Sequence, residues 1–145
     1  MAELPSSEEE RWCEDRRVQV AEYLRREGIS HGRIGEWPAW HVAPYVSIWA
    51  IESATTPDSI GWWVICGDGP TDYVCAGQVS HPRDAVRAFG TRWEEVASYM
   101  LRTEPHPTIE LGTPKTWPEL GPLLKKRAAL LRASADDESL WQPAP

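Results

Sequence analysis

The residues that could carry chemistry are a histidine and two aspartates near the ends of predicted strands. His41 directly follows Trp40, and Asp68 and Asp72 lie in a predicted turn that contains glycine and proline. A histidine beside a carboxylate can act as a general base. A His41–Asp68 or His41–Asp72 dyad would supply this chemistry. The simpler interpretation is that the aspartates bond turn amides and the histidine is structural.

Such a base has no evident nucleophile to activate. Cys66 and Ser47 fall inside predicted strands, not on a sharp turn or at a helix start, where nucleophiles are activated. The four histidines show no HxH or HxxxH spacing, and Gly67–Gly69 is too short and acidic for a phosphate loop. We therefore predict no catalytic residue, no metal site and no cofactor. Whether the protein is an enzyme stays open, with a non-enzymatic role favoured.

Tryptophan is the unusual feature of the composition, with nine residues against one phenylalanine. Trp37 and Trp40 flank Pro38-Ala39, and the proline stiffens this short segment. Two interpretations remain. The two tryptophans either fill the core beneath a loop (a core plug) or line one wall of a binding cleft. The candidate binding residues are Trp37, Trp40, His41, Asp68, Asp72 and Tyr73.

Three predicted helices and three predicted strands must position these side chains. Apolar residues at spacings of three and four indicate helices, and segments rich in β-branched and aromatic residues indicate strands. The helices are expected at residues 8–27, 82–100 and 117–133, and the strands at 45–52, 60–66 and 73–78. An ordered loop is expected at 29–44 and a helical turn at 136–141. The order α-β-β-β-α-α predicts an α+β fold: a small three-stranded antiparallel meander with one N-terminal and two C-terminal helices.

A register follows if the first two strands form a hairpin with Glu52 near Ile60. Trp49 would then lie opposite Trp63. Both faces of this hairpin are apolar, so helices, a ligand or a partner must cover the second face. The face with Tyr45, Ser47, Trp49 and Trp63 is the candidate for partial exposure, because its side chains are amphipathic.

Length and charge limit the classes of protein. The 145 residues fit one domain spanning residues 1–145, with 1–7 and 142–145 expected to fray. The net charge of −7 argues against nucleic acid or an anionic membrane as partner, since both need a basic face. Three cysteines without CxxC spacing and an acidic start without an apolar run favour the reduced cytoplasm.

Three long strings have an unusual composition: GEWPAWHVAPYVSIWAIES, GWWVICGDGPTDY and HPRDAVRAF. They resemble an uncharacterised bacterial single-domain family, a domain of unknown function whose members have about this length. The resemblance runs from about Trp12 to Trp141. It implies a bacterial single-domain protein and brings no activity, cofactor or catalytic residue.

The residues favour a non-enzymatic binding or interaction protein of the bacterial cytoplasm. Its concrete form would be an immunity-type protein that blocks a basic partner protein, since acidity speeds such association and tryptophans often anchor interfaces. The alternative is a small-molecule-binding protein or enzyme that uses a Trp/His/Asp cleft. The oligomeric state does not follow from the sequence.

Overall fold

A computed structural model of the chain describes residues 6–141, apart from the side chain of Gln78. These residues form two compact units, residues 6–85 (unit 1) and 86–141 (unit 2). Of the segments expected to fray, residues 1–5 and 142–145 lie outside the described part. Ser6 and Ser7, which were also expected to fray, are the N-cap and the first residue of helix α1, Ser7–Arg26. The organisation as one domain stays a prediction.

Unit 1 begins with helix α1, Ser7–Arg26, within one residue of its predicted bounds. The Ser6 hydroxyl caps the helix by accepting a hydrogen bond from the Glu9 amide at 3.0 Å. Three glutamates in the first turn stabilise the positive end of the helix dipole. Gly28, at φ +69°, allows the left-handed conformation that ends the helix.

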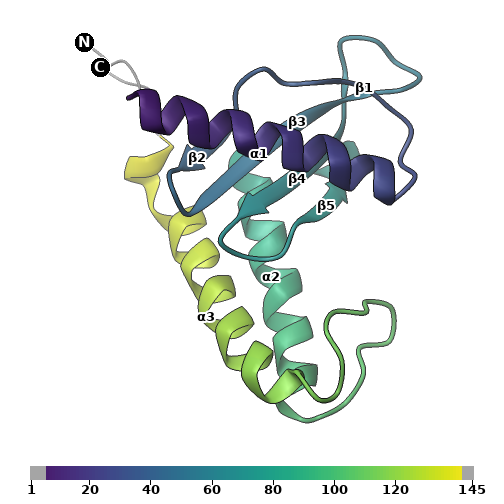
Figure 1. Cartoon of the computed structure of the whole chain (residues 1–145), viewed down its shortest axis with the longest axis vertical. Helices are drawn as coiled ribbons and strands as arrows, with labels where there is room; N and C mark the ends of the chain where they lie inside the picture. Colours follow the sequence, from purple (N-terminus) through teal and green to yellow (C-terminus); the bar gives the residue numbers. More distant parts are fainter. Residues whose placement is uncertain (1–5, 142–145) are drawn as a thin grey trace. The chain divides into compact units, whose positions relative to one another are not determined.

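The sheet of unit 1 has five strands and not three. They are β1 His31–Ile34, β2 Trp40–Val42, β3 Val46–Ser53, β4 Ile60–Gly67 and β5 Asp72–Cys75. The order is β1-β3-β4-β5, and β2 also pairs with β3, all antiparallel (Figure 1). The two additional strands lie in the predicted loop 29–44. They are too short to show an alternating pattern of apolar residues. They form because they pair with β3, and not because their own residues have a high β propensity.

The predicted third strand does pair beside the second, as β5 against β4. It is shorter than expected because residues 76–78 form the 3-10 helix η1, Ala76–Gln78.

The β3–β4 register differs by one residue from the predicted one. Glu52 pairs with Ile60 as expected, but Trp49 pairs with Val64 and not with Trp63. A one-residue shift moves a side chain to the other face of a sheet, so the two tryptophans lie on opposite faces.

A β-bulge causes this shift. The register breaks between Ile51 and Glu52, and Gly61 is the extra residue on β4. A Cβ atom at Gly61 would lie 2.9 Å from Ser53 Cα, which is closer than any side chain tolerates. The bulge therefore depends on glycine at this position.

Both faces of the sheet are buried. Helix α1 lies across one face (Figure 1), where the core consists of Val20, Leu24, Trp49, Ile51, Val64 and Cys66. On the opposite face Ile48, Trp63 and Ile65 are also buried. The predicted partial exposure of Ser47, Trp49 and Trp63 is therefore wrong, and only Tyr45, just before β3, is exposed.

Unit 2 is built from two helices and the long loop between them. Helix α2 spans Pro82–Leu101, α3 spans Trp117–Asp136, and the 3-10 helix η2 spans Glu138–Leu140. The helices approach closely at Gly90, where a Cβ would lie 3.3 Å from Ala128 O, and at Gly121, where it would lie 3.3 Å from Met100 Cβ. Within residues 6–141, no helix has the length and apolar character needed to cross a bilayer.

Candidate functional site

His41 binds a carboxylate, but not one of the two predicted aspartates. Its Nε2 lies 2.6 Å from Glu9 Oε1, in the first turn of α1. The Trp37 ring meets the imidazole edge-on, with 5.3 Å between the ring centroids. The side chains of His41 and Glu9 are 17% and 32% exposed, so the pair is partly buried. No spacing signal could have found Glu9, because it lies 32 residues away on another element.

Asp72 lies across the sheet from His41, and Asp68 lies beside Tyr45, just after β2. β2 and β5 are separated by β3 and β4, which places the backbones of His41 and Asp72 about 14 Å apart at strand spacing. Asp72 Oδ1 accepts a hydrogen bond from the Tyr73 amide at 2.9 Å. The Asp68 amide donates to Tyr45 O at 2.8 Å, just after β4. The Asp72 contact fits the structural role expected of acids in turns, whereas the Asp68 contact is made by its backbone.

The remaining aromatic candidates are also dispersed. Tyr73 packs between the rings of Tyr23 and Trp62, at 6.1 and 5.8 Å, beside the core under α1. Trp40 is half-buried in β2, whereas Trp37 is 42% exposed. Of the six predicted binding residues, the structure brings Trp37 and His41 together by a ring contact. Trp37 is a surface residue and not a core plug.

The buried thiols are poor nucleophiles. Burial raises the pKa of Cys66 to about 11, and burial followed by the Glu9 charge raises the pKa of Cys13. At neutral pH both are thiols, and only thiolates attack. Among residues 6–141, no group of three or more His, Cys, Asp or Glu could hold a metal ion.

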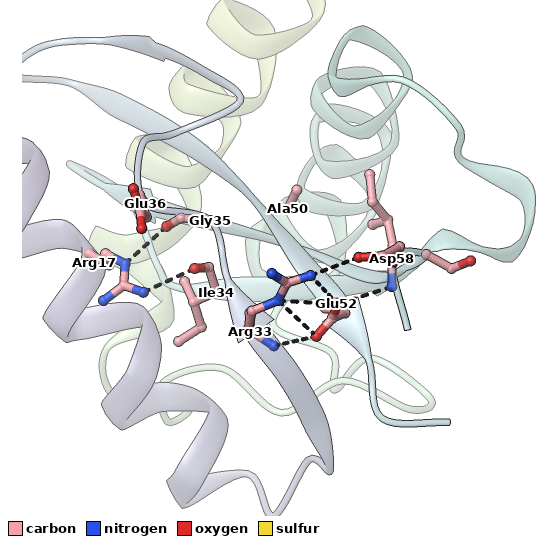
Figure 2. Close-up of a pocket in the computed structure, with 10 residues that line it drawn as sticks. Arg17, Arg33, Ile34, Gly35, Glu36, Ala50, Glu52 and Asp58 are labelled. Atoms are coloured by element: carbon pink, nitrogen blue, oxygen red, sulfur yellow. Dashed lines mark hydrogen bonds and ion pairs between the residues drawn. The ribbon is translucent and has the colours of Figure 1, made fainter. Parts of the chain in front are cut away.

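An open cleft of about 520 Å³ lies beside β1 (Figure 2). Arg17 reaches it from α1 and donates from Nε to Gly35 O and from Nη2 to Ile34 O, both at 2.9 Å. These carbonyls lie at the end of the edge strand β1, where unpaired backbone groups could pair with another strand. Arg17 thus protects the sheet edge and ties α1 to it.

The other side of the cleft is an ion-pair cluster centred on Glu52. Its carboxylate binds the Arg33 guanidinium, with Nη2 at 2.8 Å from Oε2, and accepts from the amides of Arg33 and Asp58. Arg33 also pairs with Asp58 Oδ1 at 2.8 Å. The hydrogen bonds from Arg33, followed by that from the Asp58 amide, lower the pKa of Glu52 to about 2. Figure 2 shows that these groups satisfy one another, so the cluster is structural.

A third feature of unit 1 is its exposed apolar edge, which we call the β2 surface: Trp37, Val42 and Tyr45. They are 42%, 40% and 61% exposed. The Tyr45 amide donates to Val42 O at 2.7 Å, and the Trp37 ring lies on the neighbouring His41. The sequence prediction placed Tyr45 on a face expected to be partly exposed but did not include it among the binding residues, and it missed Val42. Their signal was the pair of apolar side chains on either side of Ala43-Pro44, in a turn too tight to bury both.

The net negative charge of the chain comes from the segment that contains unit 1. Residues 1–85 contain fourteen acids and seven arginines, whereas residues 86–145 contain eight acids and eight basic residues. The net charge of −7 therefore belongs to the first segment.

These observations define a small α+β protein with a five-stranded antiparallel sheet and an acidic unit that exposes an aromatic edge. Its sequence matches a family described as a domain of unknown function (DUF4826) over residues 6–141, and the chain belongs to this family. Comparison with curated proteins and with solved structures finds no match.

Proposed function

We propose that this protein is a non-enzymatic interaction protein of the bacterial cytoplasm that binds a basic partner protein through the β2 surface. The observation that carries the proposal is the exposure of Trp37, Val42 and Tyr45 on one edge of the unit that holds the whole net charge. These three residues lie in or next to the edge strand β2, and large exposed apolar side chains that gather at one edge of a soluble protein are typical of interaction sites.

The chemistry of the surface fits an interface. Indole and phenol rings are the commonest anchors of protein interfaces, because they bury a large area at little entropic cost. Glu36, next to Trp37, and Asp68, bonded through its amide to Tyr45 O, place exposed acids at the margin of the surface. An apolar centre with a charged rim is the usual anatomy of a transient interface.

The specific form we propose is an immunity-type protein, which neutralises a toxin by covering its active surface. Toxins that act on nucleic acids carry basic surfaces. An acidic binding unit would be steered to such a surface, and association would slow as salt is added.

A capture experiment in the native host tests the proposal. The tagged protein, the double variant Trp37→Ala/Tyr45→Ala and the control Leu130→Ala would be compared at low salt, with bound proteins identified by mass spectrometry. Leu130 is an exposed apolar residue of unit 2 and leaves the β2 surface intact. We expect a basic protein that the wild type and the control retain. The double variant should lose at least tenfold in affinity, as expected for two anchor residues.

Dissociation constants at two salt concentrations complete this experiment. The purified pair should bind more weakly as salt rises, because the rim charges are exposed. Absence of a stable partner at low salt, or a partner that the double variant binds as well as the control does, would refute the proposal.

The contact between His41 and Glu9 supports a second candidate, a small-molecule-binding protein or enzyme. A carboxylate at 2.6 Å can orient an imidazole for general base catalysis. This candidate ranks second because the cleft of Figure 2 is not lined by His41, and the Cys13 thiol on the same helix has a raised pKa.

A further inference from the structure

Unit 2 contains a cavity of about 300 Å³ between the end of α2 and the loop that leads to α3. Its apolar walls include Val96 and Met100 from α2 and Ile109 and Leu111 from the loop. The rings of Tyr99 and Trp117 also line it. This volume is at the lower end of the range for small-molecule sites, which are mostly apolar with a few polar groups.

Hydrogen bonds fix the loop that forms one wall. His106 Nδ1 accepts from the amides of Thr108 and Ile109 at 3.2 and 3.1 Å, so the ring proton is on Nε2, which faces Glu95 Oε1 at 3.3 Å. The His106 side chain is only 8% exposed. Trp117 Nε1 donates to Leu111 O at 3.0 Å. The cavity is therefore formed before any ligand arrives, which reduces the entropic cost of binding.

The charge of the lining is negative. Glu104 and Glu110 line the cavity, and no lysine or arginine does. Glu104 is already paired with Arg102, whose Nε lies 3.4 Å from its carboxylate. Glu110 is exposed, and within residues 6–141 its carboxylate makes no hydrogen bond. One acid at the cavity is thus available to a cation.

Two aromatic rings line the cavity, and one of them already binds a cation of the protein itself. The Arg102 guanidinium already lies over the Tyr99 ring, 4.6 Å from its centroid. The negative face of an aromatic ring attracts cations, most strongly in tryptophan. Trp117 offers a second ring at this cavity.

We propose that this cavity binds a small organic ammonium ion. The apolar body of the ligand packs between Met100, Ile109 and Trp117, and its ammonium group donates to the Glu110 carboxylate. An anion would meet uncompensated negative charge, and a neutral molecule of the same shape would lose the charge-assisted hydrogen bond.

Three probes of one shape and different charge test this: benzylammonium, benzyl alcohol and benzoate, titrated into the full-length protein by calorimetry. We expect benzylammonium to bind at least about tenfold more tightly than benzyl alcohol, the usual effect of one charge-assisted bond, and benzoate to give no heat. Equal binding of the ammonium and the alcohol, or no binding of the ammonium, would overturn the proposal.

Two charge-matched variants locate the site. Glu110→Gln should weaken benzylammonium binding about tenfold. Glu36→Gln, which removes the same charge from unit 1, should leave it unchanged. In ¹⁵N spectra the probe should shift the Trp117 indole signal, assigned with Trp117→Phe, and not that of Trp37. A weakening shared by both variants, unchanged binding to Glu110→Gln, or a shift at Trp37 alone would place binding elsewhere and refute the proposal.

Discussion

The buried tryptophans of the sheet each have an acceptor for the indole N–H. Trp63 Nε1 donates to Val79 O at 2.7 Å, and Trp49 Nε1 donates to Ser47 Oγ at 2.9 Å. The Ser47 hydroxyl in turn donates to Cys66 O at 2.8 Å. Ser47 is the only polar residue among the fully buried side chains of residues 6–141, and these two bonds explain its place in the core.

Ser47→Ala should therefore destabilise the protein by about 1–3 kcal/mol, because it leaves a buried indole N–H without its acceptor. The free energy of unfolding in urea measures this. Ser98 gives a matched control, since its hydroxyl bonds Glu95 O on an exposed helix surface, and Ser98→Ala should cost less than about 0.5 kcal/mol. Equal effects of the two variants would contradict this account of Ser47.

A buried tryptophan needs an acceptor for its indole N–H, but the sequence does not say which group supplies it. Ser47 is two residues from Trp49, on the same face of β3, so this contact follows from strand geometry once the burial of that face is known. The Glu9–His41 contact depends on how α1 crosses the sheet. That angle is set by side-chain packing, which no local pattern encodes.

At the scale of elements, Glu52 joins three parts of unit 1: the end of β3, strand β1 through Arg33, and the β3–β4 loop through Asp58. A Cβ at Gly32 would lie 2.3 Å from Glu52 Oε1, so glycine leaves the space that the carboxylate occupies. The cluster thus stabilises the position of β1, a short strand whose residues have a weak β propensity.

The depressed pKa of Glu52 predicts a pH-dependent stability. The folded pKa of about 2 lies below the ordinary value of 4.5, so the folded protein binds the proton less well than the unfolded chain. The contribution of Glu52 is complete above about pH 4.5 and is lost as pH falls towards 2. The gap in melting temperature between wild type and Glu52→Gln should therefore narrow over this range.

Glu36→Gln in the same cleft controls for the loss of one negative charge. Its carboxylate makes no hydrogen bond within the described chain, so its melting temperature should follow that of the wild type at every pH. A gap for Glu52→Gln that stays constant from pH 6 to pH 2 would show that the charge of the Glu52 carboxylate does not stabilise the fold.

The long elements were predictable, and the short ones were not. Helices α1 and α2 and strands β3 and β4 were predicted within one or two residues, because each carries a clear period or a dense β-branched composition. The bulge at Gly61 was not, since an isolated glycine in a strand marks a bulge only once the partner strand is placed. Because of this one extra residue, the side chain of Trp63 lies on the face of the sheet opposite to Trp49, and not on the same face as predicted.

At the scale of the whole molecule, the two units differ in charge and in the features they offer. Unit 1 is acidic and carries the β2 surface, whereas unit 2 has no net charge and carries the cavity at the end of α2. The boundary between them, after Ala85, falls inside helix α2 and not in a linker. A break there would cost backbone hydrogen bonds of a continuous helix.

The chain should accordingly unfold in one cooperative transition, as a single domain does. Ser47→Ala destabilises unit 1, and His106→Ala removes the acceptor of two loop amides in unit 2 and should cost a similar 1–3 kcal/mol. Both variants should lower the midpoint of the same urea transition, and the transitions measured by circular dichroism and by tryptophan fluorescence should coincide.

His106→Asn, whose side-chain oxygen can replace Nδ1 as acceptor, should recover part of the lost stability. Two transitions, with each variant moving only one of them, would instead show that the units are separate domains joined through α2.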